Sequence, residues 1–400
     1  MRVPTAINPD PLPLGLAAAG MRGGVLVGGW LSDKIGRRVM FLATMVMFIV
    51  LALLQAFVTS AGWLVVVRFL LGVPLGSDIS NGYTYLMKSV PKSKCEVMGN
   101  RWQFMFAVGE VTTLAVIAVF LVANLDHKLV WRVMLGLGAV PALVILLMRH
   151  NPPETAVWLI RRGRFRKVKQ VSRDIYNDDL AMLPDEDVVI PKAQPTTFLA
   201  DMRRDSIRWR AMLYGWIACF CQASEFSTFA FYLPVLLLMV GVTADDLVGT
   251  NLALIGLYTF AAISGWVGPL LTPRIGQRGI SIAGFGTVFI SLLVAAWAIY
   301  TSNRIVIPFA AAAMLWDHYW EASSCMTIPT VVARPEYRGT ASGFAYMFVK
   351  LPSFLAIVLF PALFTAIGQA GATLLVAIFP LAGLLAAVFI LAEIYGFESD

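Results

Sequence analysis

The chain has 400 residues, of which 58% are hydrophobic and 14% are charged, and its formal net charge is +7 at pH 7. A soluble domain of this size would carry about a quarter charged residues, so the composition excludes an ordinary soluble protein and indicates a polytopic membrane protein. The positive charge does not indicate nucleic-acid binding, because the basic residues lie in polar stretches between long apolar runs.

Eleven apolar runs predict an all-α polytopic membrane protein. A run of about 20 apolar residues is long enough to cross a bilayer as a helix. The runs lie at 12–31, 39–58, 63–86, 102–124, 130–148, 211–239, 248–271, 280–300, 305–327, 343–366 and 372–394. Basic residues gather in alternate connections, and such connections face the cytoplasm. This rule places the 149–210 segment and the C-terminus in the cytoplasm.

A glycine-rich basic hinge joins the first two runs and returns later in the chain. It reads Gly-Gly-Trp-Leu-Ser-Asp-Lys-Ile-Gly-Arg-Arg over residues 28–38. Residues 268–278 repeat its glycines, its leucine, its isoleucine and two basic positions. A hairpin repeated at that distance predicts two related halves. We expect an N-terminal bundle over 1–148, a cytoplasmic loop over 149–210 and a C-terminal bundle over 211–400.

The two halves contain unequal numbers of runs. The second half shows six, and the first half shows five. We expect the missing span to precede residue 12, lost through a late start codon or a truncation, and a native eleven-span protein is the alternative. In the polar segment, the basic amphipathic stretch 161–169 and the acidic patch 185–187 predict helices lying at the cytoplasmic membrane surface.

Four motifs occur in order along the chain. They are the hinge, Arg-Phe-Leu-Leu-Gly at 68–72, Trp-Arg-Val-Met-Leu-Gly at 131–136 and Pro-Glu-Thr-Ala-Val-Trp-Leu at 153–159. Together they resemble the major facilitator superfamily of secondary transporters, and specifically its sugar-porter-like branch. The resemblance covers the chain from about residue 15 to its end. It implies two helical bundles that rock around a central substrate site, with a proton gradient as energy source and no cofactor.

The resemblance also implies a cytoplasmic gate. The matching positions are Gly29, Asp33, Gly36, Arg37, Arg38, Glu154, Arg274 and Arg338. Other positions depart from the pattern. The Glu-x-x-Pro-x-x-x-Arg-Gly loop reads Lys-Ser-Val-Pro-Lys-Ser-Lys-Cys-Glu over 88–96, with its charges reversed, while Val157 and Pro273 replace charged residues. We therefore expect the contacts that clamp the halves together to be partly rewired.

The sugar-contacting positions of the branch are half retained. Gln103, Gln222 and Ser224 match them, whereas Glu225 stands in place of a glycine and Ser227 in place of an asparagine. A polyol needs many neutral hydrogen-bonding partners. The changes therefore argue against a plain sugar as substrate.

Several ionisable residues fall inside the predicted spans, where a charge is costly and indicates function. Midplane positions between the repeats are also where secondary transporters bind their substrates. Candidates for proton coupling are Asp78, Glu110, Glu225, Asp317, His318 and Glu321. The alternative is purely structural pairing, of Arg22 with Asp78 and of Lys350 with Glu225.

The densest of these clusters is Asp317, His318 and Glu321. Residues 317 and 321 are one helical turn apart and share a face. Two carboxylates that close cannot both carry charge cheaply away from water, and histidine changes its protonation near neutral pH. The cluster is therefore suited to taking up and releasing a proton.

The candidate substrate-binding residues are Arg22, Gln103, Gln222, Trp316 and Lys350. A cation in a cavity of low dielectric attracts a carboxylate or phosphate, so we expect a small organic anion, a sugar acid or a sugar, carried with a proton. The protein is expected to be a monomer in the cytoplasmic membrane, with no nucleic-acid partner.

Two other functions compete with proton symport. A drug or metabolite exporter of the same fold and a truncated, non-transporting homologue are the alternatives. An enzyme is not expected, because the chain shows no nucleophile–base pair and no phosphate loop. The four cysteines lack metal-ligand spacing and are interpreted as small apolar packing residues.

Overall fold

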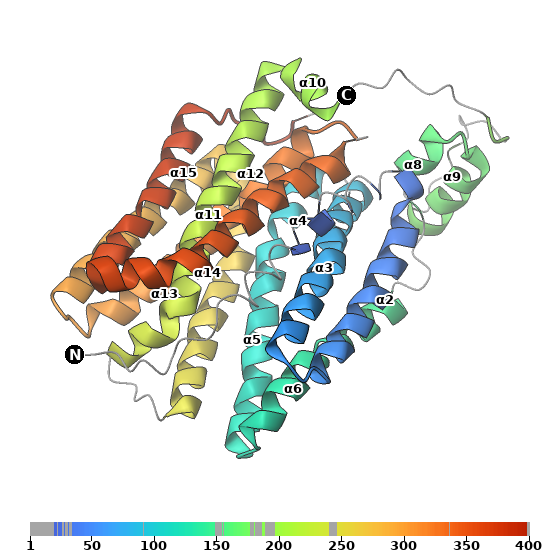
Figure 1. The fold of residues 1–400 in the computed structure, drawn as a ribbon. Coiled ribbons are helices and arrows are strands. Elements are labelled where there is room, and N and C mark those ends of the chain that lie inside the picture. The colour runs from blue at the N-terminus through green and yellow to red at the C-terminus, as the bar shows by residue number, and fades with distance from the viewer. Residues whose placement is uncertain are drawn as a thin grey trace.

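The computed structural model describes residues 20–21, 23–25, 28, 31, 34–90, 92–148, 154, 156–176, 180, 186–188, 197–239, 246–335 and 337–397. Every regular element in these residues is a helix, and the long helices lie alongside one another (Figure 1). The predicted all-α class is confirmed. Most of the first predicted span, 12–31, lies outside the described residues.

The helices of the N-terminal half follow the predicted spans. They are α2 (Arg37–Ala56), α3 (Ala61–Ser89), α4 (Lys92–Asn100), α5 (Trp102–Val122), α6 (His127–Leu137) and α7 (Ala139–Met148). The start of α3 is set by Ser60, whose side chain accepts a hydrogen bond from the Trp63 amide and so satisfies a free N–H group of the first turn. The predicted span 130–148 is interrupted at Gly138, between α6 and α7.

The C-terminal half contains longer helices. They are α11 (Ser206–Met239), α12 (Leu247–Tyr300), α13 (Val306–Val332), α14 (Arg338–Val376) and α15 (Ile378–Phe389). Non-helical backbone at Gly276 divides α12 between the predicted spans 248–271 and 280–300, and Gly368 divides α14 in the same way. Both glycines have φ near +74°, which a residue with a Cβ rarely adopts.

Six helical segments of the described chain are long and apolar enough to cross a membrane. They are Arg38–Ala56, Ala61–Met87, Lys94–Val122, Leu129–Met148, Leu247–Tyr300 and Ala362–Phe389. The helices α11 and α13 are outside this set. These two helices carry the buried charged residues described below.

Several short helices connect the two halves in the sequence. They are α8 (Ala156–Arg161), α9 (Phe165–Val171), the π-helical turn η1 (Ser172–Tyr176) and α10 (Phe198–Arg203). The predicted basic amphipathic stretch forms parts of α8 and α9, with Phe165 and Val168 buried. Asp187 accepts a hydrogen bond from the Arg166 amide, which ties the acidic patch to α9.

The two halves share their apolar core. Tyr83 of α3 belongs to a buried cluster formed mainly by α11, α13, α14 and α15. Ala107 of α5 belongs to a second cluster with residues of α11, α12 and α13. Figure 1 shows α5 between the blue N-terminal helices and the yellow-to-red C-terminal ones. Both clusters include several alanines, and small residues allow helices in a membrane to approach closely.

Replacement of Gly276 by alanine should destabilise the protein. The new Cβ would meet the Glu393 carboxylate oxygen at 2.1 Å, and the residue would keep a left-handed φ of 74°. The backbone conformation alone costs about 1–2 kcal/mol. We expect a lower thermal unfolding midpoint in detergent. Gly256→Ala, on the same helix with no atom within 4 Å of its new Cβ, is the control and should not lower it. Equal unfolding midpoints for the two variants would show that position 276 does not require glycine.

Candidate functional site

Three ionisable side chains meet in the interior of the C-terminal half. Glu225 comes from α11, and His318 and Glu321 come from α13. The Nδ1 atom of His318 is in hydrogen-bond contact with Glu225 Oε1 and lies 3.3 Å from Glu321 Oε1. One imidazole nitrogen therefore faces two carboxylates. We call these residues the carboxylate–imidazole group.

Burial makes this group sensitive to its own charge. Both glutamates are 0% exposed, and His318 is 2% exposed. The second carboxylate oxygen of each glutamate is buried without a hydrogen-bond partner among the described residues. An unpaired buried charge is costly, and two neighbouring carboxylates cannot both ionise cheaply. The charged state of this group is therefore costly unless its members offset one another's charge.

The same three side chains are a plausible donor set for a metal ion. Their ligand atoms all lie within 4.8 Å of one another, and an imidazole with carboxylates is a set that divalent transition metals accept. In this structure His318 Nδ1 and Glu225 Oε1 are in direct hydrogen-bond contact with each other. The group is therefore also a candidate proton-binding site.

The surrounding residues fix the group in place. The Phe226 ring stacks on the His318 ring with centroids 4.3 Å apart and planes at 13°. Behind Glu321, α12 approaches closely at Gly284, where a Cβ would lie 2.5 Å from the Glu321 amide nitrogen. Any side chain at 284 would push α13 away. The absence of a side chain at Gly284 thus lets α12 pack directly against the backbone of α13 at Glu321.

A half-buried carboxylate, that of Glu110, links the two halves near this group. The Tyr319 hydroxyl of α13 donates a hydrogen bond of 2.6 Å to Glu110 Oε2 of α5. Tyr319 directly follows His318 and packs edge-on against its ring. The N-terminal half is therefore connected to the carboxylate–imidazole group through one adjacent residue. Sequence spacing did not indicate the role of Tyr319.

The predicted pairing of Asp317 with Glu321 is not observed, and Glu225 takes that place. Asp317 is half-buried, within hydrogen-bonding reach of the Thr287 hydroxyl. Helical spacing does put residues 317 and 321 on one face, but the approach of α11 decides which carboxylate meets Glu321. Asp78 lies half-buried on α3 and does not belong to the group.

The predicted substrate-binding residues are placed as follows. Gln103 on α5 and Gln222 on α11 are buried. Trp316 is half-buried beside Phe260, with ring centroids 4.6 Å apart. The alternative pairing of Lys350 with Glu225 is not observed, because the Lys350 ammonium lies 5.1 Å from the centroid of the Tyr346 ring. Arg22 lies outside the described residues.

Four of the predicted gate residues, Gly36, Arg37, Arg38 and Glu154, lie at the first hinge. Gly36 has φ 101°, and a Cβ there would meet Glu154 Oε2 at 2.5 Å. The same oxygen accepts a hydrogen bond from the Arg38 amide at 3.4 Å. Glu154 thus caps the free N–H groups that begin α2. Arg37 begins that helix, and Gly29 and Asp33 lie outside the described residues.

The second hinge is capped in the same way by a residue that the sequence prediction missed. Glu393 accepts hydrogen bonds from the amides of Gln277 (2.9 Å) and Arg278 (3.1 Å). It follows Gly276 at almost the same spacing as Glu154 follows Gly36, and this spacing was the available signal. Arg274 is exposed, and Arg338 donates from Nε to the Ala333 carbonyl.

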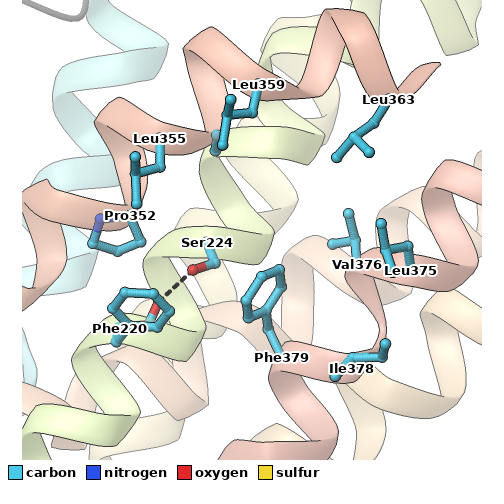
Figure 2. Close-up of a pocket in the computed structure, with 11 residues that line it drawn as sticks. Phe220, Ser224, Pro352, Leu355, Leu359, Leu363, Leu375, Val376, Ile378 and Phe379 are labelled. Atoms are coloured by element: carbon cyan, nitrogen blue, oxygen red, sulfur yellow. Dashed lines mark hydrogen bonds between the residues drawn. The ribbon is translucent and has the colours of Figure 1, made fainter. Parts of the chain in front are cut away.

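An apolar pocket of about 290 Å³ lies between α11, α14 and α15. Figure 2 shows leucines and the Phe220 and Phe379 rings around it, with Ser224 as its polar residue. The Ser224 hydroxyl already donates to the Phe220 carbonyl. A polar metabolite would lose its hydrogen bonds to water there without replacement. This pocket is therefore unsuited to such a ligand.

Comparisons with known proteins agree that the chain is similar to membrane transporters. The family described as "Sugar (and other) transporter" matches residues 13–398. "Inner membrane metabolite transport protein YgcS" of Escherichia coli (strain K12) is 28% identical over 282 residues, covering 70% of this chain but only 60% of that protein. "Probable metabolite transport protein CsbC" of Bacillus subtilis (strain 168) is 24% identical over 379 residues, covering 92% of this chain and 80% of that protein.

Solved structures show the same fold. The proton:xylose symporter XylE bound to 6-bromo-6-deoxy-D-glucose superposes with a TM-score of 0.78 at 18% identity, covering 96% of this chain and 86% of that one. A partially occluded inward-open conformation of XylE from E. coli gives 0.72, also at 18% identity, covering 99% and 92%. The fold is therefore that of the major facilitator superfamily, as the motifs predicted.

The hydrogen bond between Glu110 and Tyr319 should stabilise the contact between the halves. Tyr319→Phe removes the hydrogen bond to the half-buried Glu110 carboxylate, and loss of a hydrogen bond to a charged group costs about 1–3 kcal/mol. We expect a lower thermal unfolding midpoint in detergent, and a smaller loss when the same change is made in a Glu110→Gln background. Tyr300→Phe, at a residue 82% exposed, is the control. Additive losses in the double variant would refute the coupling.

Proposed function

The chain belongs to the sugar (and other) transporter family, and on that basis we propose that it carries a small polar metabolite across the cytoplasmic membrane by proton symport. Family membership and fold support a multi-pass membrane transporter without enzymatic activity. The XylE neighbour is itself a proton:xylose symporter.

The observation that carries the proposal is the carboxylate–imidazole group. Its three side chains are buried and in mutual contact, so each gain or loss of one proton changes a charge inside an apolar environment. Such a change is costly unless the surroundings change with it. A site of this kind favours a different protein conformation in each protonation state, which is the requirement for coupling transport to protons.

A path for that coupling runs through α13. Glu321 and His318 belong to the proton site, and the next residue, Tyr319, donates to Glu110 of the N-terminal half. Movement of α13 on proton release would shift Tyr319 against α5. The two bundles could then rock about the central site, as alternating access requires. The proposal thus assigns Glu110 to transmission of the proton signal.

The substrate is proposed to be a small organic anion or a sugar acid, with a sugar as the less favoured choice. Lys350 on the half-buried face of α14 supplies a cation without a carboxylate partner among the described residues. Gln103 and Gln222 supply buried amides. The positions that would serve a plain sugar are partly lost to Glu225 and Ser227, and Glu225 is already engaged with His318.

Neutralising the proton site should uncouple transport from the pH gradient. In proteoliposomes loaded with a pH-sensitive dye, an active solute from a panel of sugars, sugar acids and aromatic acids should drive protons inward. Glu225→Gln keeps the side-chain size but removes the shared charge, so we expect at least a tenfold loss of that proton flux. Glu186→Gln, at an exposed residue of the polar segment, is the control.

Persisting proton flux in Glu225→Gln would contradict the proton site. Solute movement in the opposite direction, with protons exchanged for solute, would instead support an exporter of the same fold.

The sign of the substrate charge can be tested at Lys350. Lys350→Gln should weaken binding of sugar acids at least tenfold and leave binding of neutral sugars unchanged, because only the anion loses a Coulombic partner. Ligand-dependent shifts of the thermal unfolding midpoint measure this. Lys167→Gln, at an exposed lysine of α9, is the control. An equal loss for neutral and acidic solutes would overturn the proposed anion preference.

A further inference from the structure

We propose that a polar latch locks the two halves together at the hinge-bearing end. It is made of Glu96 and Asn100 of α4, Thr272 and Gln277 of α12, and the C-terminal tail. The inference rests on the proposed transport by rocking bundles. It concerns a different part of the molecule from the proton site. None of the four residues is among the gate positions implied by the motifs.

Glu96 of α4 is the centre of the latch. Its Oε2 accepts a hydrogen bond of 2.7 Å from Gln277 Nε2, just beyond the bend of α12. Its Oε1 accepts a hydrogen bond of 2.6 Å from the Gly396 amide in the C-terminal tail. One carboxylate of the N-terminal half thus binds two separate segments of the C-terminal half.

A second contact, one helical turn further along α4, adds to the first. Asn100 Nδ2 lies 3.2 Å from Thr272 Oγ1 and 3.3 Å from Gln277 Oε1. The Gln277 amide therefore uses its nitrogen toward Glu96 and its oxygen toward Asn100. The amide nitrogen and the amide oxygen of Gln277 are therefore both bonded to the other half of the protein.

The latch is buried, which makes these bonds consequential. Glu96 is 7% exposed, and Asn100, Thr272 and Gln277 are 0% exposed. Buried polar groups that lose their partners pay the full cost of desolvation until water reaches them. The halves therefore separate here only if all the bonds break and water enters together. This gives the end of the molecule two defined states, closed and open.

The C-terminal tail is held to α12 by its own contacts. Glu393 caps the amides of Gln277 and Arg278, as described above. Within the tail, the same carboxylate accepts a hydrogen bond from the Tyr395 amide at 2.8 Å. The tail, the α12 bend and α4 are therefore three elements joined at Gln277 and Glu96.

Two departures from the motif pattern meet in this contact. Glu96 stands at the glycine of the Glu-x-x-Pro-x-x-x-Arg-Gly loop, and Gln277 stands where the first hinge has Arg37. The two changed positions touch each other directly. A neutral amide has replaced a basic residue at the position that faces a new acid. The proposed latch therefore uses hydrogen bonds at positions where the motif pattern does not place this acid and amide.

The neighbouring Cys95 provides a native reporter of the latch. Its thiol is half-buried and lies 3.3 Å from the Met87 carbonyl, and Cys95 directly precedes Glu96 in the sequence. The other three cysteines, Cys219, Cys221 and Cys325, are buried in the core of the C-terminal half. Alkylation of Cys95 by a maleimide, quantified by peptide mass spectrometry, therefore reports how often the latch opens. The assay needs neither substrate nor a proton gradient.

Gln277→Ala should raise the rate of Cys95 alkylation in detergent roughly tenfold, since the variant removes the hydrogen-bonding side chain from both Glu96 and Asn100. Gln55→Ala is the matched control, because Gln55 is equally buried but donates to the Leu135 carbonyl inside the N-terminal half. Its alkylation rate should equal that of the unaltered protein. An unchanged rate in a normally eluting Gln277→Ala protein, or an equal rise in Gln55→Ala, would overturn the latch.

A size-preserving variant covers the case in which Gln277→Ala does not fold. Gln277→Glu fills the same volume but places a second acid against Glu96, so we expect faster alkylation than in the unaltered protein. The added negative charge disfavours the reactive thiolate, and a rise therefore reports opening instead of altered thiol chemistry. No rise in this variant would also refute the proposal. Loss of proton flux in Glu225→Gln with an intact latch response would support the two proposals separately.

Discussion

The contact between His318 and two buried glutamates is the constraint on which the structure of the C-terminal half depends. Charged groups in an apolar interior need partners, and here the partners come from different helices, Glu225 from α11 and Glu321 from α13. The two helices must therefore keep their relative position. Gly284 on α12 permits the close approach that holds Glu321 there. Three helices are thus fixed by one buried group.

The same helix that supports the proton site also carries the latch. Gln277 and Gly284 are seven residues apart on α12, about two helical turns. A displacement of α13 against Gly284 would be passed along the rigid helix to Gln277 and from there to Glu96. The proposed proton site and the closed hinge-bearing end are consequently connected through continuous packing. The connection through Tyr319 and Glu110 works at the level of the site itself.

Periodicity and composition predicted the spans and the two hinges, because long apolar runs and glycines with basic neighbours leave a local signal. The sequence also indicated that Glu225, His318 and Glu321 were out of place in a membrane. It did not show that Glu225, ninety-three residues before His318, completes the group in place of Asp317. Partners distant in sequence are chosen by tertiary packing. Glu393 was missed for a different reason, since its cap becomes recognisable only beside Glu154.

The two hinges share a capping carboxylate but differ in what they bind across the molecule. At the first hinge, Arg38 is exposed and its amide is bonded to Glu154 of the segment that follows the N-terminal bundle. At the second, Gln277 is buried and bonded to α4 of the other half. A repeated element that has diverged in this way contributes unequally to closure. Since Gln277 is bonded to both Glu96 and Asn100 of the other half, separation at this end should depend directly on the second hinge.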